Sequence, residues 1–131
     1  MIYLDANILI RLIEGDIAAR APVEAKLQHA RVNAPFLTTS RLSRLECRVK
    51  PLREGNSSLL SLYEQLFNSN ELQMTELHAA VIEKATELRS TLKLKTPDAI
   101  HLASAIVERC SLFLTGDKDL AKVTEIAVEV V

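Results

Sequence analysis

The chain is poor in the residues that interrupt or crosslink a protein fold. Among 131 residues it has only 3 glycines and 4 prolines, a composition that argues against low complexity and favours dense regular structure. The two cysteines, Cys47 and Cys110, form no Cys-x-x-Cys pair, so soft ligands are too few for a zinc site. We expect two buried free thiols in a reducing cytosol, with a single disulfide as the lesser alternative.

Long apolar runs and aromatic residues are also scarce. No run approaches the ~20 residues that a membrane span needs, and the start Met-Ile-Tyr-Leu-Asp shows no feature of a signal peptide. We therefore expect a cytoplasmic protein with no membrane partner. Aromatic residues make up 4% of the chain, so extensive stacking on nucleic-acid bases is not predicted.

Charge is balanced, with 16 basic and 17 acidic residues and a net charge of -1. This balance neither predicts nor excludes a nucleic-acid partner, because clustering matters more than the sum. Two basic groups flank candidate site residues: Arg41, Arg44 and Arg48 at helical spacing, and Arg89, Lys93 and Lys95 ahead of Asp98. Either these groups attract RNA or DNA phosphates, or they form a solvated helix face, and the sequence favours neither interpretation.

Short apolar segments alternate with segments of helical periodicity along the whole chain. Strands are predicted at residues 2–4, 35–39, 72–74, 112–114 and 126–131, and helices at 6–13, 16–31, 40–50, 53–67, 77–92, 97–110 and 117–123. Gly15 and Pro51 are expected to end two of the helices, and Ser40 to cap the start of another. This order predicts an α/β fold, with a central parallel sheet covered by helices on both faces, in a single domain spanning residues 1–131.

Four acidic residues occur where strand or helix ends would bring them together. Asp5 closes the first apolar run and Asp117 closes the run at 112–114. Glu46 lies on the helix after the second strand, and Asp98 opens a helix behind Pro97. Because ligands of open parallel sheets bind beyond the carboxyl ends of the strands, we expect these four side chains to face one region.

Gathered carboxylates repel one another, and a divalent metal ion relieves that repulsion. Asp5, Asn7, Glu46, Asp98 and Asp117 all offer hard oxygen atoms, with no histidine or cysteine cluster beside them. These ligands favour Mg²⁺ or Mn²⁺ over zinc. Such a metal can activate a water molecule for attack on a phosphodiester.

Each of these residues also has a purely structural explanation. Asp5 suits the turn after a strand, and Asn7 suits a turn or a helix cap. Glu46 fits a capping box with Ser43, and Asp98 is a favourable charge in the first turn of a helix. Asp117 or its neighbour Asp119 suits the cap of a short helix. The combination of all four acids in this order is what indicates a site.

His101 follows Asp98 by three residues and lies on the same side of the predicted helix. It either modulates the acidic residues without binding the metal itself or packs between the helix and the sheet. Packing is the preferred interpretation.

Four short motifs together resemble the PIN domain family, and most closely its VapC toxins of type II toxin–antitoxin systems. They are Leu4-Asp5-Ala6-Asn7, Ser43-Arg44-Leu45-Glu46-Cys47, Asp98-Ala99-Ile100-His101-Leu102-Ala103 and Leu114-Thr115-Gly116-Asp117. The resemblance covers essentially the whole chain. It implies an α/β/α sandwich around a parallel sheet and a metal-dependent ribonuclease.

The resemblance also implies roles for individual residues and partners. Asp5, Glu46, Asp98 and Asp117 would be the catalytic and metal-binding acids, with Mg²⁺ or possible Mn²⁺ as cofactor, and Asn7 and Thr115 would support them. Asp119 is assigned no catalytic role. The implied partners are an RNA substrate, such as transfer or ribosomal RNA, a cognate antitoxin that binds at or near the acidic cleft, and a second copy of the chain.

Two other functions stay open at the level of sequence. An aspartyl phosphatase or phosphotransferase would use Asp5 as its nucleophile, but it would need a second acid where the chain has Asn7. A non-catalytic module that binds RNA or a protein partner would keep the fold without cleaving RNA. The apolar positions in the helices between Leu42 and Phe67 offer a surface for dimerisation.

Overall fold

Strands and helices alternate along the computed structural model, which describes residues 1–131. The strands are β1 (Ile2–Leu4), β2 (Leu37–Ser40), β3 (Leu72–Thr75), β4 (Leu112–Thr115) and β5 (Val128–Val130). The α-helices are α1 (Ala6–Glu14), α2 (Ile17–Ala30), α3 (Arg41–Glu54), α4 (Ser57–Phe67), α5 (Ala79–Thr91) and α6 (Thr96–Val107), and η1 (Lys118–Lys122) is a 3-10 helix.

The five strands form one parallel sheet in the order β3-β2-β1-β4-β5. The chain builds outward from β1 to β2 and β3 on one side, then returns to add β4 and β5 on the other. Strand order therefore reverses between β1 and β4, where ligands of doubly wound sheets usually bind. Asp5 follows β1 and Gly116-Asp117 follows β4, so both segments lie at this point.

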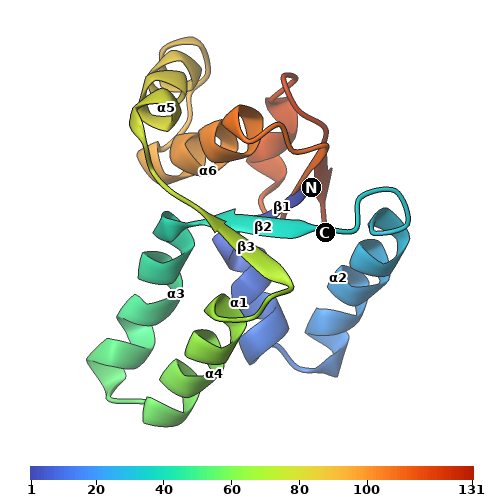
Figure 1. Ribbon diagram of the computed structural model, residues 1–131, viewed down its shortest axis with the longest axis vertical. Helices are drawn as coiled ribbons and strands as arrows, with labels where there is room; N and C mark the ends of the chain where they lie inside the picture. The colour runs from blue at the N-terminus through green and yellow to red at the C-terminus, as the bar shows by residue number, and fades with distance from the viewer.

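Helices cover both faces of the sheet, as Figure 1 shows, with α5 and α6 on one face and α1 to α4 on the other. Successive side chains of a strand point to opposite faces. Tyr3 and Phe113 accordingly join the core under α5 and α6, whereas Ile2, Leu4 and Leu114 join the core under α1 to α4. The predicted three-layer α/β/α class is confirmed.

Helix α3 does not end at Pro51, contrary to the sequence prediction. Pro51 lies inside the helix and is buried, and the helix continues to Glu54. It ends at Gly55, whose φ of 62° is the left-handed conformation that suits glycine. Proline lacks an N–H, so Pro51 removes one backbone hydrogen bond from α3. The helix nevertheless continues for three more residues before it ends at Gly55.

Two neighbouring boundaries also differ from the sequence prediction. Helix α4 begins at Ser57 instead of residue 53, because Asn56 caps it by accepting a hydrogen bond from the Leu59 N–H. Strand β2 extends to Ser40, which pairs with Thr75 of β3. Ser40 does precede α3, but its side chain makes no capping hydrogen bond.

None of the helices is both long enough and apolar enough to cross a lipid bilayer. Both cysteines are buried free thiols, as the sequence predicted. Burial raises the pKa of the Cys47 thiol to about 12 and that of Cys110 to about 11. Both thiols are therefore protonated at neutral pH and poor nucleophiles.

Candidate active site

Asp5 lies at the carboxyl end of β1 and is only 4% exposed. Its Oδ1 accepts a hydrogen bond from the Ala6 N–H at 2.8 Å, at the start of α1. Its Oδ2 accepts from the Thr115 hydroxyl at 2.8 Å and from the Asn7 amide at 3.1 Å. Three donors thus hold a buried carboxylate in one orientation at the switch point of the sheet.

Asn7 and Thr115 join the end of β1 to the loop after β4. The Asn7 Nδ2 also approaches the Thr115 Oγ1 at 3.3 Å, and the Asn7 Oδ1 accepts from the Gly116 N–H at 2.9 Å. The Thr115 Oγ1 accepts from the Asp117 N–H at 3.1 Å. Both residues contact Asp5, and their bonds to the loop set the backbone from which Asp117 projects.

Glu46 reaches the same region from the other side, along α3. Its Oε1 lies 2.5 Å from the Nε2 of His101, on α6. The Ser43 hydroxyl lies 2.6 Å from the Thr39 Oγ1, and Thr39 donates to the Leu4 carbonyl at 2.9 Å. Ser43 and Glu46 therefore bond to other segments and not to each other, so the capping box is wrong as an explanation of Glu46.

His101 is 1% exposed and uses both ring nitrogens. Its Nδ1 lies 2.8 Å from the Tyr3 hydroxyl, and its Nε2 lies 3.7 Å from the Asp5 Oδ1. In the neutral ring with its proton on Nε2, His101 donates to Glu46 and accepts from Tyr3. Sequence reasoning preferred packing, and the structure shows packing and contact with Glu46 together. Tyr3, one strand position before Leu4, was not anticipated as the partner of His101.

Asp98 lies in the first turn of α6, and its pKa is raised. Burial is the largest cause, followed by the negative charges of Asp5 and Asp117; Glu46 adds to the effect and His101 opposes it. The charges of the other three predicted acids therefore all raise the pKa of Asp98, although less than its burial does. That the four side chains form one site stays a prediction.

The four acids do not converge closely enough to coordinate one metal ion together. In residues 1–131, no three acidic, histidine or cysteine side chains converge as the ligands of one ion do. Asp5 is held by its three donors, Glu46 faces His101, and the Asp117 Oδ1 accepts from the Asp119 N–H at 2.9 Å. The donor set nevertheless fits a hard divalent cation, because all four groups offer carboxylate oxygens.

The basic helix face predicted at Arg41, Arg44 and Arg48 is largely paired with carboxylates. Arg41 lies 2.9 Å from Glu76, and Arg44 and Arg48 lie 3.0 and 3.1 Å from Glu64. Such exposed pairs add little stability. They do reduce the positive charge that this face offers to a phosphate, which favours the interpretation of a solvated helix face.

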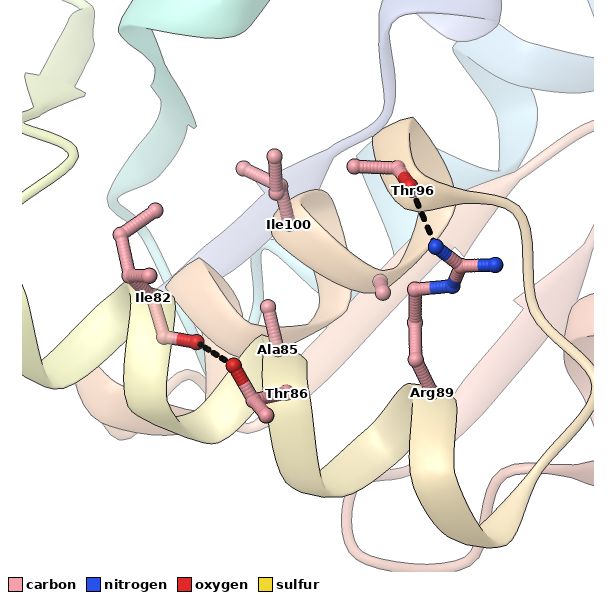
Figure 2. A pocket seen from close by; sticks show the side chains of 7 residues that line it. Ile82, Ala85, Thr86, Arg89, Thr96 and Ile100 are labelled. Atoms are coloured by element: carbon pink, nitrogen blue, oxygen red, sulfur yellow. Dashed lines mark hydrogen bonds between the residues drawn. The ribbon is translucent and has the colours of Figure 1, made fainter.

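A separate cavity of about 320 Å³ lies between α5 and α6, and Figure 2 shows the side chains that line it. Ile82, Ala85, Thr86 and Arg89 line it from α5, with Thr96, Ala99 and Ile100 from α6. Arg89, its one charged residue, donates to the Thr96 hydroxyl at 2.8 Å and to the Leu94 carbonyl at 3.0 Å. None of the four acids lines this cavity, so it is not part of the acidic site.

Solved structures share the fold over nearly the whole chain. A toxin–antitoxin complex from Klebsiella pneumoniae matches with 25% identity and a TM-score of 0.70, covering 97% of this chain and 96% of that one. VapBC2 of Rickettsia felis, bound to a DNA fragment from its promoter, matches with 19% identity and a TM-score of 0.72, covering 99% and 98%. VapC20 of Mycobacterium tuberculosis, a toxin that cleaves the sarcin–ricin loop, matches with 17% identity and a TM-score of 0.72, covering 97% and 99%.

A search of curated protein sequences finds no match to this chain. The family profile of the PIN domain, in contrast, matches residues 2–126. That range contains all four acids, together with Asn7, Thr115 and His101. The resemblance to PIN domains and VapC toxins predicted from the four motifs is confirmed by the profile and by the solved structures: the chain belongs to the PIN domain family.

Proposed function

We propose that this chain is a metal-dependent endoribonuclease and the toxin of a type II toxin–antitoxin pair. The observation that carries the proposal is the placement of four acids around the switch point of the sheet, where burial and the charges of the other three raise the pKa of Asp98. Family membership and the similarity to VapC structures support it. The unit that carries the activity is a single domain, residues 1–131.

The four acids would hold Mg²⁺ or Mn²⁺, and the ion would neutralise their charge and activate a water molecule for attack on an RNA phosphodiester. The chain's own residues have defined tasks. Asp5 is oriented by Asn7 and Thr115, while His101 orients Glu46. Asp98 and Asp117 complete the acidic group from α6 and the loop after β4.

The test is RNA cleavage by the purified chain with Mg²⁺ or Mn²⁺, compared with EDTA. Asp5→Asn and Asp98→Asn should each abolish cleavage. Asp119→Asn is the matched control, because it removes one nearby negative charge that is exposed and has no assigned role. Cleavage that survives both Asp5→Asn and Asp98→Asn would refute the proposal.

Transfer RNA and ribosomal RNA are the substrates to offer first, since VapC20 cleaves the sarcin–ricin loop. Expression of the wild-type chain without a partner should slow cell growth. Asp98→Asn should relieve that effect. A folded, metal-loaded chain that binds RNA, cleaves none of these RNAs and leaves growth unchanged would favour the non-catalytic binding module instead.

Partner binding is supported by apolar side chains that the fold leaves exposed. Leu45, Val49 and Leu52 on α3 are 58%, 42% and 60% exposed, and Leu62 of α4 is 46% exposed. Exposed apolar surface on neighbouring helices is typical of a site where another protein binds. We propose an antitoxin and a second copy of this chain as its protein partners, and sedimentation of the chain with and without its antitoxin tests both.

We also propose that the protein works in the cytoplasm. Two buried thiols without a disulfide suit a reducing compartment. Fractionation of cells that express the tagged chain would test this proposal. Recovery with the membrane or secreted fraction would contradict it.

A further inference from the structure

A polar pocket of about 480 Å³ opens beside the acidic site. Its lining consists of Asn7, Arg11, Gly116, Asp117 and Lys118, with no apolar residue among them. Asn7 and Asp117 belong to both the pocket and the acidic site, so the two are continuous. Two cationic side chains thus stand next to a group of carboxylates.

Arg11 is held at this pocket by its surroundings. Its Nη1 donates to the backbone oxygen of Val131 at 2.9 Å, at the end of the segment after β5. A Cβ atom built on Gly116 would lie 2.7 Å from the Arg11 Nη2. Glycine at position 116 is therefore what allows the guanidinium to lie against the loop that carries Asp117.

Neither cation of the pocket pairs with an aspartate or glutamate side chain. The one hydrogen bond of the Arg11 guanidinium goes to an oxygen of Val131, which leaves most of its donors free. Lys118 is the first residue of η1, is exposed and forms no ion pair. By contrast, Arg41, Arg44 and Arg48 on α3 are all paired with glutamates.

We propose that Arg11 and Lys118 bind an RNA phosphate that neighbours the scissile one. This inference rests on the proposed ribonuclease function and deepens it. A strand that crosses the acidic site carries a phosphate on every nucleotide, so the next phosphate falls into the adjoining pocket. A guanidinium and an ammonium are the groups that proteins use for phosphate oxygens.

The lining favours a phosphate over a segment of a protein partner. Protein interfaces are centred on apolar and aromatic side chains that fill pockets, and this pocket offers none. The exposed large apolar side chains of the chain lie elsewhere, on α2, α3, α4 and α5 and in the segment between α2 and β2. Binding of a partner peptide at Arg11 and Lys118 is the competing outcome that the test must distinguish.

The test measures RNA binding separately from cleavage. In an Asp98→Asn background, a fluorescein-labelled, mixed-sequence, single-stranded RNA is titrated with protein in EDTA, and Kd is obtained from anisotropy at several KCl concentrations. Arg11→Gln and Lys118→Gln should each raise Kd about tenfold, as expected for loss of a hydrogen bond to a charged group. A plot of the logarithm of the association constant against the logarithm of salt concentration has a negative slope. The double variant should make that slope less steep by about 0.7, the value for one phosphate contact on a single strand.

Two further variants separate a binding role from a structural one. Lys122→Gln is the matched control, because Lys122 lies in the same 3-10 helix, and its Nζ bonds to the Lys93 carbonyl, outside the pocket. It should leave Kd unchanged. Gly116→Ala keeps both positive charges but displaces the Arg11 guanidinium, so it should raise Kd without lowering the thermal midpoint.

The outcomes distinguish this inference from the proposed function. Arg11→Gln and Lys118→Gln variants that bind RNA as the Lys122→Gln variant does would overturn the subsite, even if the wild type cleaves RNA. Loss of antitoxin binding with unchanged RNA binding would also overturn it, in favour of a peptide site. RNA binding that depends on both cations in a wild type that never cleaves would uphold the subsite and refute the nuclease.

Discussion

Tyr3→Phe tests the buried contact that orients His101 and, through it, Glu46. The Tyr3 hydroxyl lies 2.8 Å from the His101 Nδ1, and both residues are almost fully buried. The ring of Tyr3 stacks on Phe113, with centroids 5.2 Å apart and planes inclined by 7°. Phenylalanine keeps this stacking, so the substitution removes only the hydroxyl.

The expected cost follows from what is left behind. With no water access, the Nδ1 of His101 loses its only partner and stays unsatisfied, which costs about 1–3 kcal/mol. Urea denaturation reports this cost directly. With an m value of about 2 kcal/mol/M, the midpoint should fall by roughly 0.5–1.5 M at unchanged m.

Tyr63→Phe is the matched control. The Tyr63 hydroxyl donates to the Glu14 Oε2 at 2.5 Å, and its ring packs on Phe67. Glu14 is exposed, so water replaces the lost hydroxyl and the expected cost is below about 1 kcal/mol. A Tyr3→Phe variant that is as stable as the wild type, or less affected than Tyr63→Phe, would refute the described role of His101.

Three further predictions concern the charge and packing of the site. Because the pKa of Asp98 is raised in the folded state, the folded state binds more protons than the unfolded state between the two pKa values. The free energy of unfolding should therefore fall as pH rises from about 3.9 through that raised pKa. Asp98→Asn should remove this slope and raise the thermal midpoint at pH 7 in EDTA; a lower midpoint would contradict the repulsion. Mg²⁺ at about 100 times its Kd should stabilise the wild type by about 2.7 kcal/mol in a thermal scan, and Asp5→Asn should abolish the effect. Leu102→Ala, at a fully buried position of α6, should cost about 2–5 kcal/mol in urea denaturation, whereas Leu45→Ala on the exposed face of α3 should cost far less.

The order of elements was readable from the sequence because each carries a local signal. Apolar runs mark strands such as Ile2–Leu4, and helical spacing marks segments such as Ala79–Thr91. The end of α3 was predicted wrongly, since proline is a local signal whose effect depends on packing. Pro51 is buried and the helix passes through it to Gly55, and nothing in the sequence near Pro51 specifies that burial.

The positions of two of the four acids were predictable for a related reason. Asp5 and Asp117 follow strands directly, so their positions follow from the topology of a parallel sheet. The partners of Glu46 and Arg11 were not predictable in the same way. His101 meets Glu46 across 55 residues and Tyr3 across 98, and Arg11 meets Gly116 and Val131 only once β4 and β5 are in place.

The most direct test of the account is RNA cleavage by the purified, partner-free chain with Mg²⁺, beside EDTA, Asp98→Asn and the Asp119→Asn control. The account predicts cleavage by the wild type and by Asp119→Asn only when the metal is present, and none by Asp98→Asn. Equal cleavage by Asp98→Asn and the wild type, or cleavage that persists in EDTA, would contradict the claim that the four acids form a metal-dependent active site.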